Sequence, residues 1–503
     1  MKLFLRIALF SFIALAILSA CEKDIPIVST TGSFSKEPLI EEADEISQFV
    51  YEGLQDAYLW YDKVDKLGND YFATTDDYYS YLNGFETDYE SLFYDLLYQH
   101  GTIDRWSWIV DDWEELENSF AGISKSMGYD FRLVILSGSD DVFGYIRYVL
   151  PDSPAATAGL KRGNLFKKVD GEQLTINNYR DLLFNNESYY LTLAYIDNNT
   201  IYNGDDTPVM TAEEIQENPV YYTDVIDVGG VPTAYLVYNS FTSNFDIQLN
   251  EAFDYFKSQG AGRLILDLRY NGGGSIRTSQ YLASMIYSTD TDKVFAKSLW
   301  NDKYTAYFIQ EDGEDALNYY FKDIIYASGQ NPETPITSME LNKVYVITTG
   351  STASASEMVI NGLEPYIDVK VIGSNSTGKY VGSITYKDWD SQGNVNPDHK
   401  WAMQPIVLKL VNSAGNPSDM SDPNYINGLP TDMEAEENYV NLQPFGDVNE
   451  PLLKATIDYI LGVKSAPATP GLIEGIDYEV IADSRDFKPL SKEMYLEGTF
   501  RLK

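Results

Sequence analysis

The sequence has little cysteine, histidine or positive charge. A single cysteine among 503 residues excludes an internal disulfide and any metal site built from several cysteines. Only two histidines are present, His100 and His399, so a mechanism that needs a catalytic or metal-binding histidine has few candidates. Lys and Arg number 36 against 76 Asp and Glu, and the net charge of −40 repels phosphate backbones. Nucleic acid is therefore not an expected partner.

The chain does have enough apolar material for packed domains. Hydrophobic residues make up 44% and charged residues 22%, which excludes wholesale disorder. At about 100–200 residues per domain, 503 residues are enough for about two to four domains.

The first twenty residues have the pattern of an export signal. A basic start is followed by an apolar run over 7–18, which is short for a membrane span of about 20 residues. The run ends in LSAC, which resembles the lipobox of bacterial lipoproteins and implies a signal over 1–20 and a lipid on Cys21. The polar residues 21–43 would then be a flexible tether to a bacterial envelope membrane, on its periplasmic face or at the cell surface. An ordinary secretory signal is the alternative.

The rest of the chain divides by composition and periodicity. Apolar residues at helical spacing predict a helical N-terminal region over 44–117. Short strands between Gly and Pro turns occupy 118–198, and a polar linker or insertion follows over 199–221. Strands alternating with helices over 222–465 predict a mixed α/β core, and 466–503 form a tail without a clear pattern.

The segment YVLPDSPAATAGLKRGNLFKKVDG at 148–171 resembles PDZ domains of the bacterial, protease-associated type. Such domains capture a peptide carboxy-terminus by strand addition. The matching receiving loop is near Gly128 and Tyr129, which become candidate substrate-binding residues. A small structural β domain that binds nothing is the alternative.

Two turns follow buried strands of the core, where α/β folds place their sites. The first, DLRYNGGG at 267–274, ends in three glycines that let a substrate approach the backbone, and it lacks the pattern of a phosphate loop. The second, GSTASASE at 350–357, runs from a strand into a helix. A serine there lies in the field of the helix N-terminus, beside N–H groups that can stabilise an oxyanion. SASE at 354–357 is also the pattern of a capping box, so a purely structural role stays open.

A serine nucleophile needs a base. Neither histidine occupies a strand-end position that would favour a triad. A lysine can serve when burial disfavours its ammonium form, and Lys379, in VIGSNSTGKYVGS at 371–383, is the lysine best placed between glycine-rich turns and apolar strands.

Taken together, LILDLRYNGGGSI, VYVITTGSTASASEMVINGL and VIGSNSTGKYVGS resemble the carboxy-terminal processing peptidases of family S41, which are serine–lysine peptidases. The resemblance implies Ser354 as the nucleophile and Lys379, 25 residues on, as the general base. It implies an oxyanion hole from the N–H groups of Ala355 and Gly274, with Gly273 beside them as a candidate substrate-binding residue. It implies no metal and no organic cofactor, and it does not extend to the N-terminal helical region.

Two positions depart from the family pattern. Tyr380 follows Lys379 where the family usually has glycine, and Ser383 stands where the family often has a glutamine that orients the lysine. The Ser383 hydroxyl can accept a hydrogen bond from the lysine amine, but its reach is shorter.

The sequence therefore predicts a mixed α/β peptidase core with an inserted PDZ-like β domain and a helical N-terminal cap. Its function would be that of an envelope-tethered serine endopeptidase acting on peptides or unfolded protein tails. A catalytically weak or inactive family member that binds peptides is the alternative. The 40 tyrosines leave a carbohydrate-associated surface lipoprotein as a third, weaker hypothesis. The sequence predicts no oligomeric state.

Overall fold

The computed structural model describes residues 40–198, 200–327, 332–390, 392–415, 428–439, 442–463, 478–487 and 491–498. The expected signal sequence, Cys21 and most of the expected tether lie outside these residues. Within these ranges, no helix has both the length and the apolar character needed to cross a membrane. Contacts divide the chain after Glu41, and the unit that begins at Glu42 is the one described below.

The N-terminal region is helical, as the apolar spacing predicts. Its α-helices are α1 (Glu45–Ala57), α2 (Thr75–Asn83), α3 (Tyr89–Asp95) and α4 (Trp113–Phe120), with short 3₁₀ turns at Tyr61–Lys63 and Asp65–Leu67. Helix α1 begins at Asp44, whose side chain accepts the N–H groups of Ile46 and Ser47. Helix α2 begins with a capping box formed by Thr74 and Asp77. The short strand β1 (Trp108–Val110) connects this region to the core by pairing with β24 (Ala402–Gln404).

A small β domain follows, built on an antiparallel sheet in the order β27-β3-β4-β5-β8-β9. Its strands are β3 (Tyr129–Leu136), β4 (Val142–Val149), β5 (Leu165–Val169), β8 (Leu191–Asp197), β9 (Thr200–Asp206) and β27 (Tyr478–Asp483). The short helices are α5 (Pro154–Thr157) and α6 (Tyr179–Phe184). Ser153 caps α5 by accepting the N–H of Ala156, as the Ser-Pro pair predicts.

Two parts of this region differ from the sequence-based expectation. The polar stretch 199–221 contains strands rather than a plain connection. They are β9, β10 (Met210–Thr211), β11 (Glu213–Gln216) and the start of β12 (Val220–Val228); β10 and β11 pair with β7 (Ser188–Tyr189) and β2 (Ile123–Ser126). In addition, β27 belongs to the tail 466–503, which showed no pattern, yet it covers the edge of β3 in antiparallel register. The side chains of β9 are mostly exposed, which explains its polar sequence.

The α/β core contains a six-stranded sheet in the order β12-β13-β14-β20-β21-β26. Its further strands are β13 (Val231–Tyr238), β14 (Arg263–Asp267), β20 (Lys343–Thr348), β21 (Asp368–Gly373) and β26 (Met433–Glu434). From β13 to β26 each neighbouring pair is parallel. The accompanying helices are α7 (Asp246–Ser258), α8 (Ile276–Ile286), α10 (Ala355–Leu363) and α12 (Pro451–Leu461). The turns after β14, β20 and β21 therefore leave the same edge of the sheet side by side.

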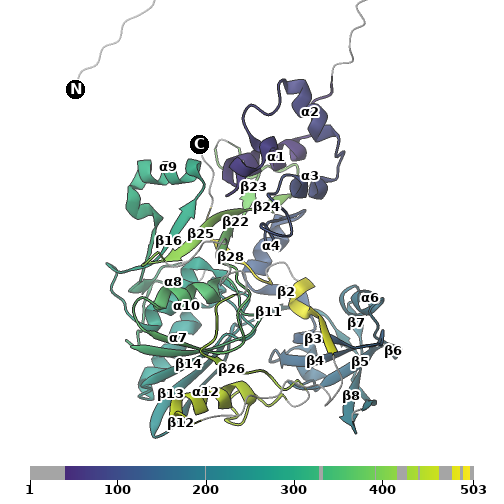
Figure 1. Cartoon of the computed structure of the whole chain (residues 1–503). Coiled ribbons are helices and arrows are strands. Elements are labelled where there is room, and N and C mark those ends of the chain that lie inside the picture. Colours follow the sequence, from purple (N-terminus) through teal and green to yellow (C-terminus); the bar gives the residue numbers. More distant parts are fainter. Residues whose placement is uncertain are drawn as a thin grey trace, which may run out of the picture. The chain divides into compact units, whose positions relative to one another are not determined.

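A second six-stranded sheet has the order β15-β28-β22-β25-β16-β17. Its strands are β15 (Gly274–Ser275), β28 (Met494–Leu496), β22 (Val381–Ile384), β25 (Ile406–Asn412), β16 (Val294–Trp300) and β17 (Asn318–Tyr320). Strand β6 (Glu172–Gln173) pairs with β5 in the small β domain. Other short elements are α9 (Asp302–Asp312), β18 (Ile324–Ile325), β19 (Thr334–Pro335) and β23 (Tyr386–Lys387). Strand β28, from the tail, lies between β15 and β22 and runs parallel to both. Figure 1 shows β28 near β22.

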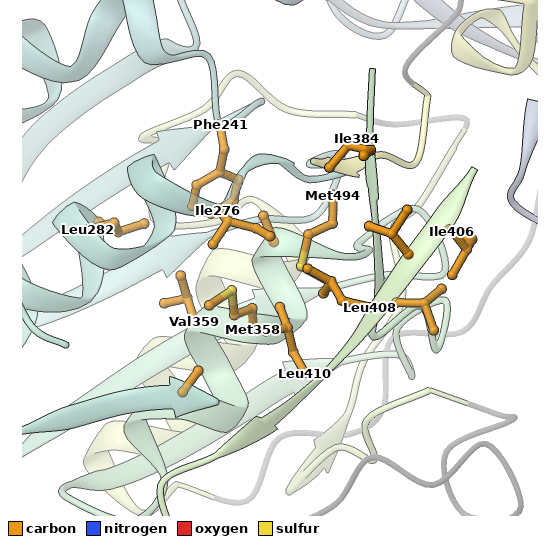
Figure 2. Close-up of a cluster of buried hydrophobic side chains, with 14 of the residues drawn as sticks. Phe241, Ile276, Leu282, Met358, Val359, Ile384, Ile406, Leu408, Leu410 and Met494 are labelled. Atoms are coloured by element: carbon orange, nitrogen blue, oxygen red, sulfur yellow. The ribbon is translucent and has the colours of Figure 1, made fainter. Parts of the chain in front are cut away.

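Buried side chains hold α8 and α10 against the second sheet. Figure 2 shows Ile276 of α8 and Met358 of α10 close to Leu408 of β25, with Met494 of β28 pointing into the same cluster. All four side chains are buried, and burying one of this size stabilises the fold by about 1.5–3 kcal/mol. The mixed α/β fold predicted for the core is confirmed, and residues of the tail are part of its packing.

Candidate functional site

Ser354 lies in the turn that joins β20 to α10, at the N-cap position of the helix. Its backbone has φ 67° and ψ −116°, a conformation that costs a residue with a Cβ about 1–3 kcal/mol. The side chain is buried, and its Oγ has no hydrogen-bond partner among the described residues. Backbone strain and an unpartnered buried hydroxyl both destabilise the folded state, and such features are found mostly at functional positions.

Glu357 holds the Ser354 turn and the Lys379 turn together. Its Oε2 accepts the backbone N–H of Ser354 at 2.6 Å and that of Lys379 at 2.8 Å, and its Oε1 accepts the N–H of Gly378 at 2.6 Å. Burial raises the pKa of Glu357, while these hydrogen bonds act in the opposite direction. The glutamate of the predicted capping box therefore caps the helix and also fixes the lysine turn.

The Lys379 side chain is fully buried in contacts with the tail. Its Nζ donates to the carbonyl oxygen of Lys492 at 2.7 Å and lies 3.2 Å from Oε2 of Glu493. The indole ring of Trp106, from the N-terminal region, lies 5.1 Å from Nζ. Burial lowers the pKa of Lys379, and the charge of Glu493 partly opposes that shift.

Ser383 reaches Lys379 through Glu493. The Ser383 hydroxyl lies 3.1 Å from Oε2 of Glu493 and accepts a hydrogen bond from Nε2 of Gln404 at 3.2 Å. The other oxygen of Glu493 accepts the indole N–H of Trp108 at 3.0 Å. The sequence analysis considered a direct hydrogen bond from the lysine amine to Ser383. The structure instead places the Glu493 carboxylate against both groups.

The glycine turn after β14 packs directly on Ser354. A Cβ on Gly273, at φ 112°, would lie 2.6 Å from Cβ of Ser354 and 3.0 Å from the backbone nitrogen of Ala355. The Gly273 N–H is oriented by Oδ1 of Asn271 at 2.9 Å. Ala355 is the first residue of α10, where an N–H has no partner within the helix. The N–H of Gly274 donates to the carbonyl oxygen of Glu493 at 2.6 Å.

Gly128 and Tyr129 lie at the start of β3, in the small β domain. Gly128 has φ 77°, and a Cβ there would lie 2.2 Å from Cβ of Ser153, so only glycine fits. The Tyr129 hydroxyl is hydrogen-bonded to that of Tyr189 at 2.8 Å. Tyr129 also lines a pocket of about 410 Å³ whose lining does not include Ser354. The structure thus brings Ser354, Ala355, Gly273, Gly274, Lys379 and Ser383 into one region and leaves Gly128 and Tyr129 in another.

Sequence reasoning missed Glu493, Trp106 and Asn271. Nothing in the sequence around Glu493 indicates a buried carboxylate, and its partners are far away along the chain. Asn271 sits in the motif that was singled out, and its asparagine among glycines was a usable signal. His399 lies 3.2 Å from Asp388, whereas His100 stacks on Tyr94 and lines a pocket together with Trp106 and residues 491–493. In the part of the chain that the structure describes, no group of His, Cys, Asp and Glu is arranged to hold a metal ion.

Comparisons with known proteins show similarity to one peptidase family. Residues 232–395 match the model of peptidase family S41, and residues 45–108 match the peptidase S41 N-terminal domain. These two parts of the chain are therefore similar to peptidases of family S41. The second match covers the N-terminal region, where the sequence analysis found no resemblance.

Two curated relatives are C-terminal processing proteases. The chain is 25% identical over 237 residues to the carboxyl-terminal-processing protease of Picosynechococcus sp., covering 46% of this chain and 49% of the relative. It is 25% identical over 334 residues to the chloroplastic C-terminal processing peptidase of Tetradesmus obliquus, covering 63% and 62%. The matched parts are thus about half to under two thirds of these relatives.

A crystal structure of a Bacteroides fragilis protein described as an S41 protease has the same fold. It superposes with a TM-score of 0.61 at 24% identity, covering 83% of this chain and 98% of that one.

Proposed function

We propose that this chain is a serine endopeptidase in which Ser354 is the nucleophile and Lys379 the general base. The observation that carries the proposal is that one carboxylate oxygen accepts hydrogen bonds from both residues. Oε2 of Glu357 accepts the backbone N–H groups of both residues, so the positions of the strained serine and the buried lysine are fixed relative to each other. The similarity to peptidase family S41 and the unpartnered Ser354 hydroxyl support the same assignment.

The proposed reaction is acyl transfer. The neutral amine of Lys379 takes the proton of the Ser354 hydroxyl as Oγ bonds to the carbonyl carbon of a peptide bond. The N–H groups of Ala355 and Gly274 stabilise the oxyanion. The C–N bond then breaks, and the leaving amine receives the proton from Lys379. Water, deprotonated by the same amine, attacks the acyl-enzyme and releases the new carboxyl end while Ser354 regains its proton.

Burial supports the role of Lys379. A lysine acts as a base only when neutral, and burial lowers its pKa from the ordinary value of 10.5. The aromatic ring of Trp106 and the absence of side-chain exposure keep water away from the amine. Peptides or unfolded protein tails are the proposed substrates.

The remaining sequence-based hypotheses belong to the same proposal. The small β domain would receive a peptide near Gly128 and Tyr129, and its fold of strands and two short helices is compatible with a PDZ-like domain. A lipid on Cys21 would tether the chain to a bacterial envelope membrane, and the LSAC sequence supports it.

The test is labelling of residues 22–503 with a fluorophosphonate probe, followed by mass spectrometry. We expect one adduct on Ser354 that Ser354→Ala abolishes and that Lys379→Ala slows by at least about a hundredfold. Ser356→Ala is the matched control, because Ser356 is a buried serine in the same turn whose hydroxyl is bonded to the carbonyl of Asn271. An adduct that persists in Ser354→Ala would refute the assignment.

A further inference from the structure

The tail residues 491–498, called here the C-terminal segment, contact the groups assigned to catalysis. Gly274 donates its N–H to the carbonyl of Glu493, and the Lys379 amine donates to the carbonyl of Lys492. The segment's backbone also packs on the glycine turn. A Cβ on Gly272 would lie 1.8 Å from the carbonyl oxygen of Ser491. The oxyanion donor and the base therefore both have a partner from the chain itself.

The segment is held as a strand in a slot with an edge on each side. Met494 and Tyr495 pair with Gly274 and Ser275 of β15, and Tyr495 and Leu496 pair with Ser383 and Ile384 of β22. Without β28, β15 and β22 would both present unpaired backbone groups to a single strand. Strand addition to such edges is a general mode of peptide recognition.

The slot includes an apolar pocket for one side chain. Met494 is fully buried and points into the cluster that contains Ile276, Met358 and Leu408 (Figure 2). Met494 directly follows Glu493, whose carbonyl is bound by Gly274. A peptide that replaced the segment in this register would place an apolar side chain of similar size in the same pocket.

Two open pockets flank the segment. One of about 450 Å³ is lined by Trp106, Trp108 and residues 491–493. The other, of about 500 Å³, is lined by Phe120, Arg277 and residues 495–498. The slot thus opens at both ends of the segment, which leaves space for a longer chain to continue in either direction.

We propose that the slot between β15 and β22 is the peptide-binding slot of the peptidase, and that the C-terminal segment fills it as an intramolecular occupant that must leave before a substrate strand enters. This inference rests on the proposed function. The substrate class it names is an extended peptide that runs parallel to β22 and carries an apolar residue, such as Met or Leu, at the position of Met494. The conformation described here is then a latent one.

A reversible lock tests this proposal. Ile384 and Leu496 are paired across β22 and β28, so their Cα atoms are about 4.8 Å apart, within the range that a disulfide spans. The body over residues 22–503 has no cysteine. In that body, the double variant Ile384→Cys and Leu496→Cys would form one disulfide that holds the segment in its slot. The same molecules are then compared oxidised and reduced. The unsubstituted body over residues 22–503, under both conditions, is the control, because it has no cysteine to oxidise.

We expect the oxidised variant to label at Ser354 at least about tenfold more slowly than the reduced variant, with the rate restored by reductant. Equal labelling of the two redox forms would overturn the occupancy and leave the proposed function intact. No labelling of wild type or of either redox form would refute the proposed function itself.

A second measurement uses the wild-type body and needs no cross-link. The synthetic peptide SKEMYLEG, which copies 491–498, should slow fluorophosphonate labelling, and the same peptide with Asp in place of Met should not. Equal effects of the two peptides would overturn the pocket assignment. Cleavage of wild type between Glu493 and Met494 that Ser354→Ala lacks would also overturn the proposal, because the segment would then be a substrate rather than a standing occupant.

Discussion

The carboxylate of Glu493 lies 3.2 Å from the amine of Lys379, and both side chains are almost fully buried. A carboxylate this close favours the protonated lysine, while burial favours the neutral one. Glu493 belongs to the C-terminal segment, so the same contact that fills the slot also acts against the base. Release of the segment would remove the blocking backbone and the opposing charge together.

The pH dependence of labelling follows from this pair. Because burial lowers the pKa of Lys379, the labelling rate should rise with pH along a curve whose midpoint lies below 10.5. Glu493→Gln removes the charge that raises this pKa, so the midpoint should move to lower pH. Glu497→Gln is the matched control, because it makes the same charge change in the same segment but pairs with Arg277. A midpoint that stays fixed or rises in Glu493→Gln would contradict the opposing role.

Backbone strain at Ser354 can be measured as stability. At φ 67° and ψ −116°, glycine avoids the Cβ penalty that serine and alanine both carry. Ser354→Gly should therefore raise the free energy of unfolding by about 1 kcal/mol relative to Ser354→Ala, although both variants lose labelling. Denaturant titration of the two variants measures the difference. If the glycine variant were the less stable of the two, the turn would not be strained.

Acid stability should depend on Glu437. The guanidinium groups of Arg162 and Arg269 hold its pKa at about 2, below the ordinary value of 4.5. A pKa lowered in the folded state gives stability that is present above about pH 4.5 and is lost as the pH falls toward 2. Glu437→Gln should cost up to about 3–5 kcal/mol at pH 7, since it removes one of the carboxylates that the buried guanidinium groups of Arg162 and Arg269 contact.

The difference between wild type and Glu437→Gln should shrink as the pH is lowered toward 2, which unfolding measurements at pH 3 and pH 7 would show. Glu436→Gln, at the exposed neighbouring position, should have little effect at either pH. Arg162 lies in the small β domain and Glu437 follows β26, so the variant also tests how firmly these two parts are connected.

A second buried carboxylate, that of Asp246, should make the free energy of unfolding fall as the pH rises. Burial raises the pKa of Asp246, at the start of α7, to about 8. The folded state therefore binds a proton that the unfolded state releases between about pH 4 and pH 8, and stability falls as the pH rises through this window. Asp246→Asn should remove that decline, measured as the free energy of unfolding at pH 5.5 and 8.5. Glu251→Gln, exposed on the same helix, should decline as wild type does.

The sequence predicted those parts of the fold that have a strong local signal. Strand Lys343–Thr348 and helix Ala355–Leu363 lie on either side of the GSTASASE turn, as predicted, because an apolar run and a capping pattern mark them within a few residues. The turns that carry Ser354 and Lys379 were found for the same reason. Both follow buried parallel strands, and such strands place their ends at one edge of the sheet.

The tail could not be predicted, because its role depends on distant partners. Strand Met494–Leu496 has only three residues, too few to show a period, and its neighbours come from positions more than a hundred residues earlier. Glu493 resembles any surface glutamate in sequence, and only the folded chain places Lys379 beside it. Strand Thr200–Asp206 was not predicted, for another reason. Its side chains are mostly exposed, so a polar sequence is compatible with either a strand or a loop.

The position of β28 inside its sheet, rather than at an edge, has a consequence for assembly. When an interior strand leaves, it exposes two rows of unpaired backbone groups at once, on β15 and on β22. A second molecule that has released its own β28 carries a strand that fits this gap in sequence and register. If the slot opens as we propose, strands can exchange between copies, and the opened form should associate more strongly as its concentration rises.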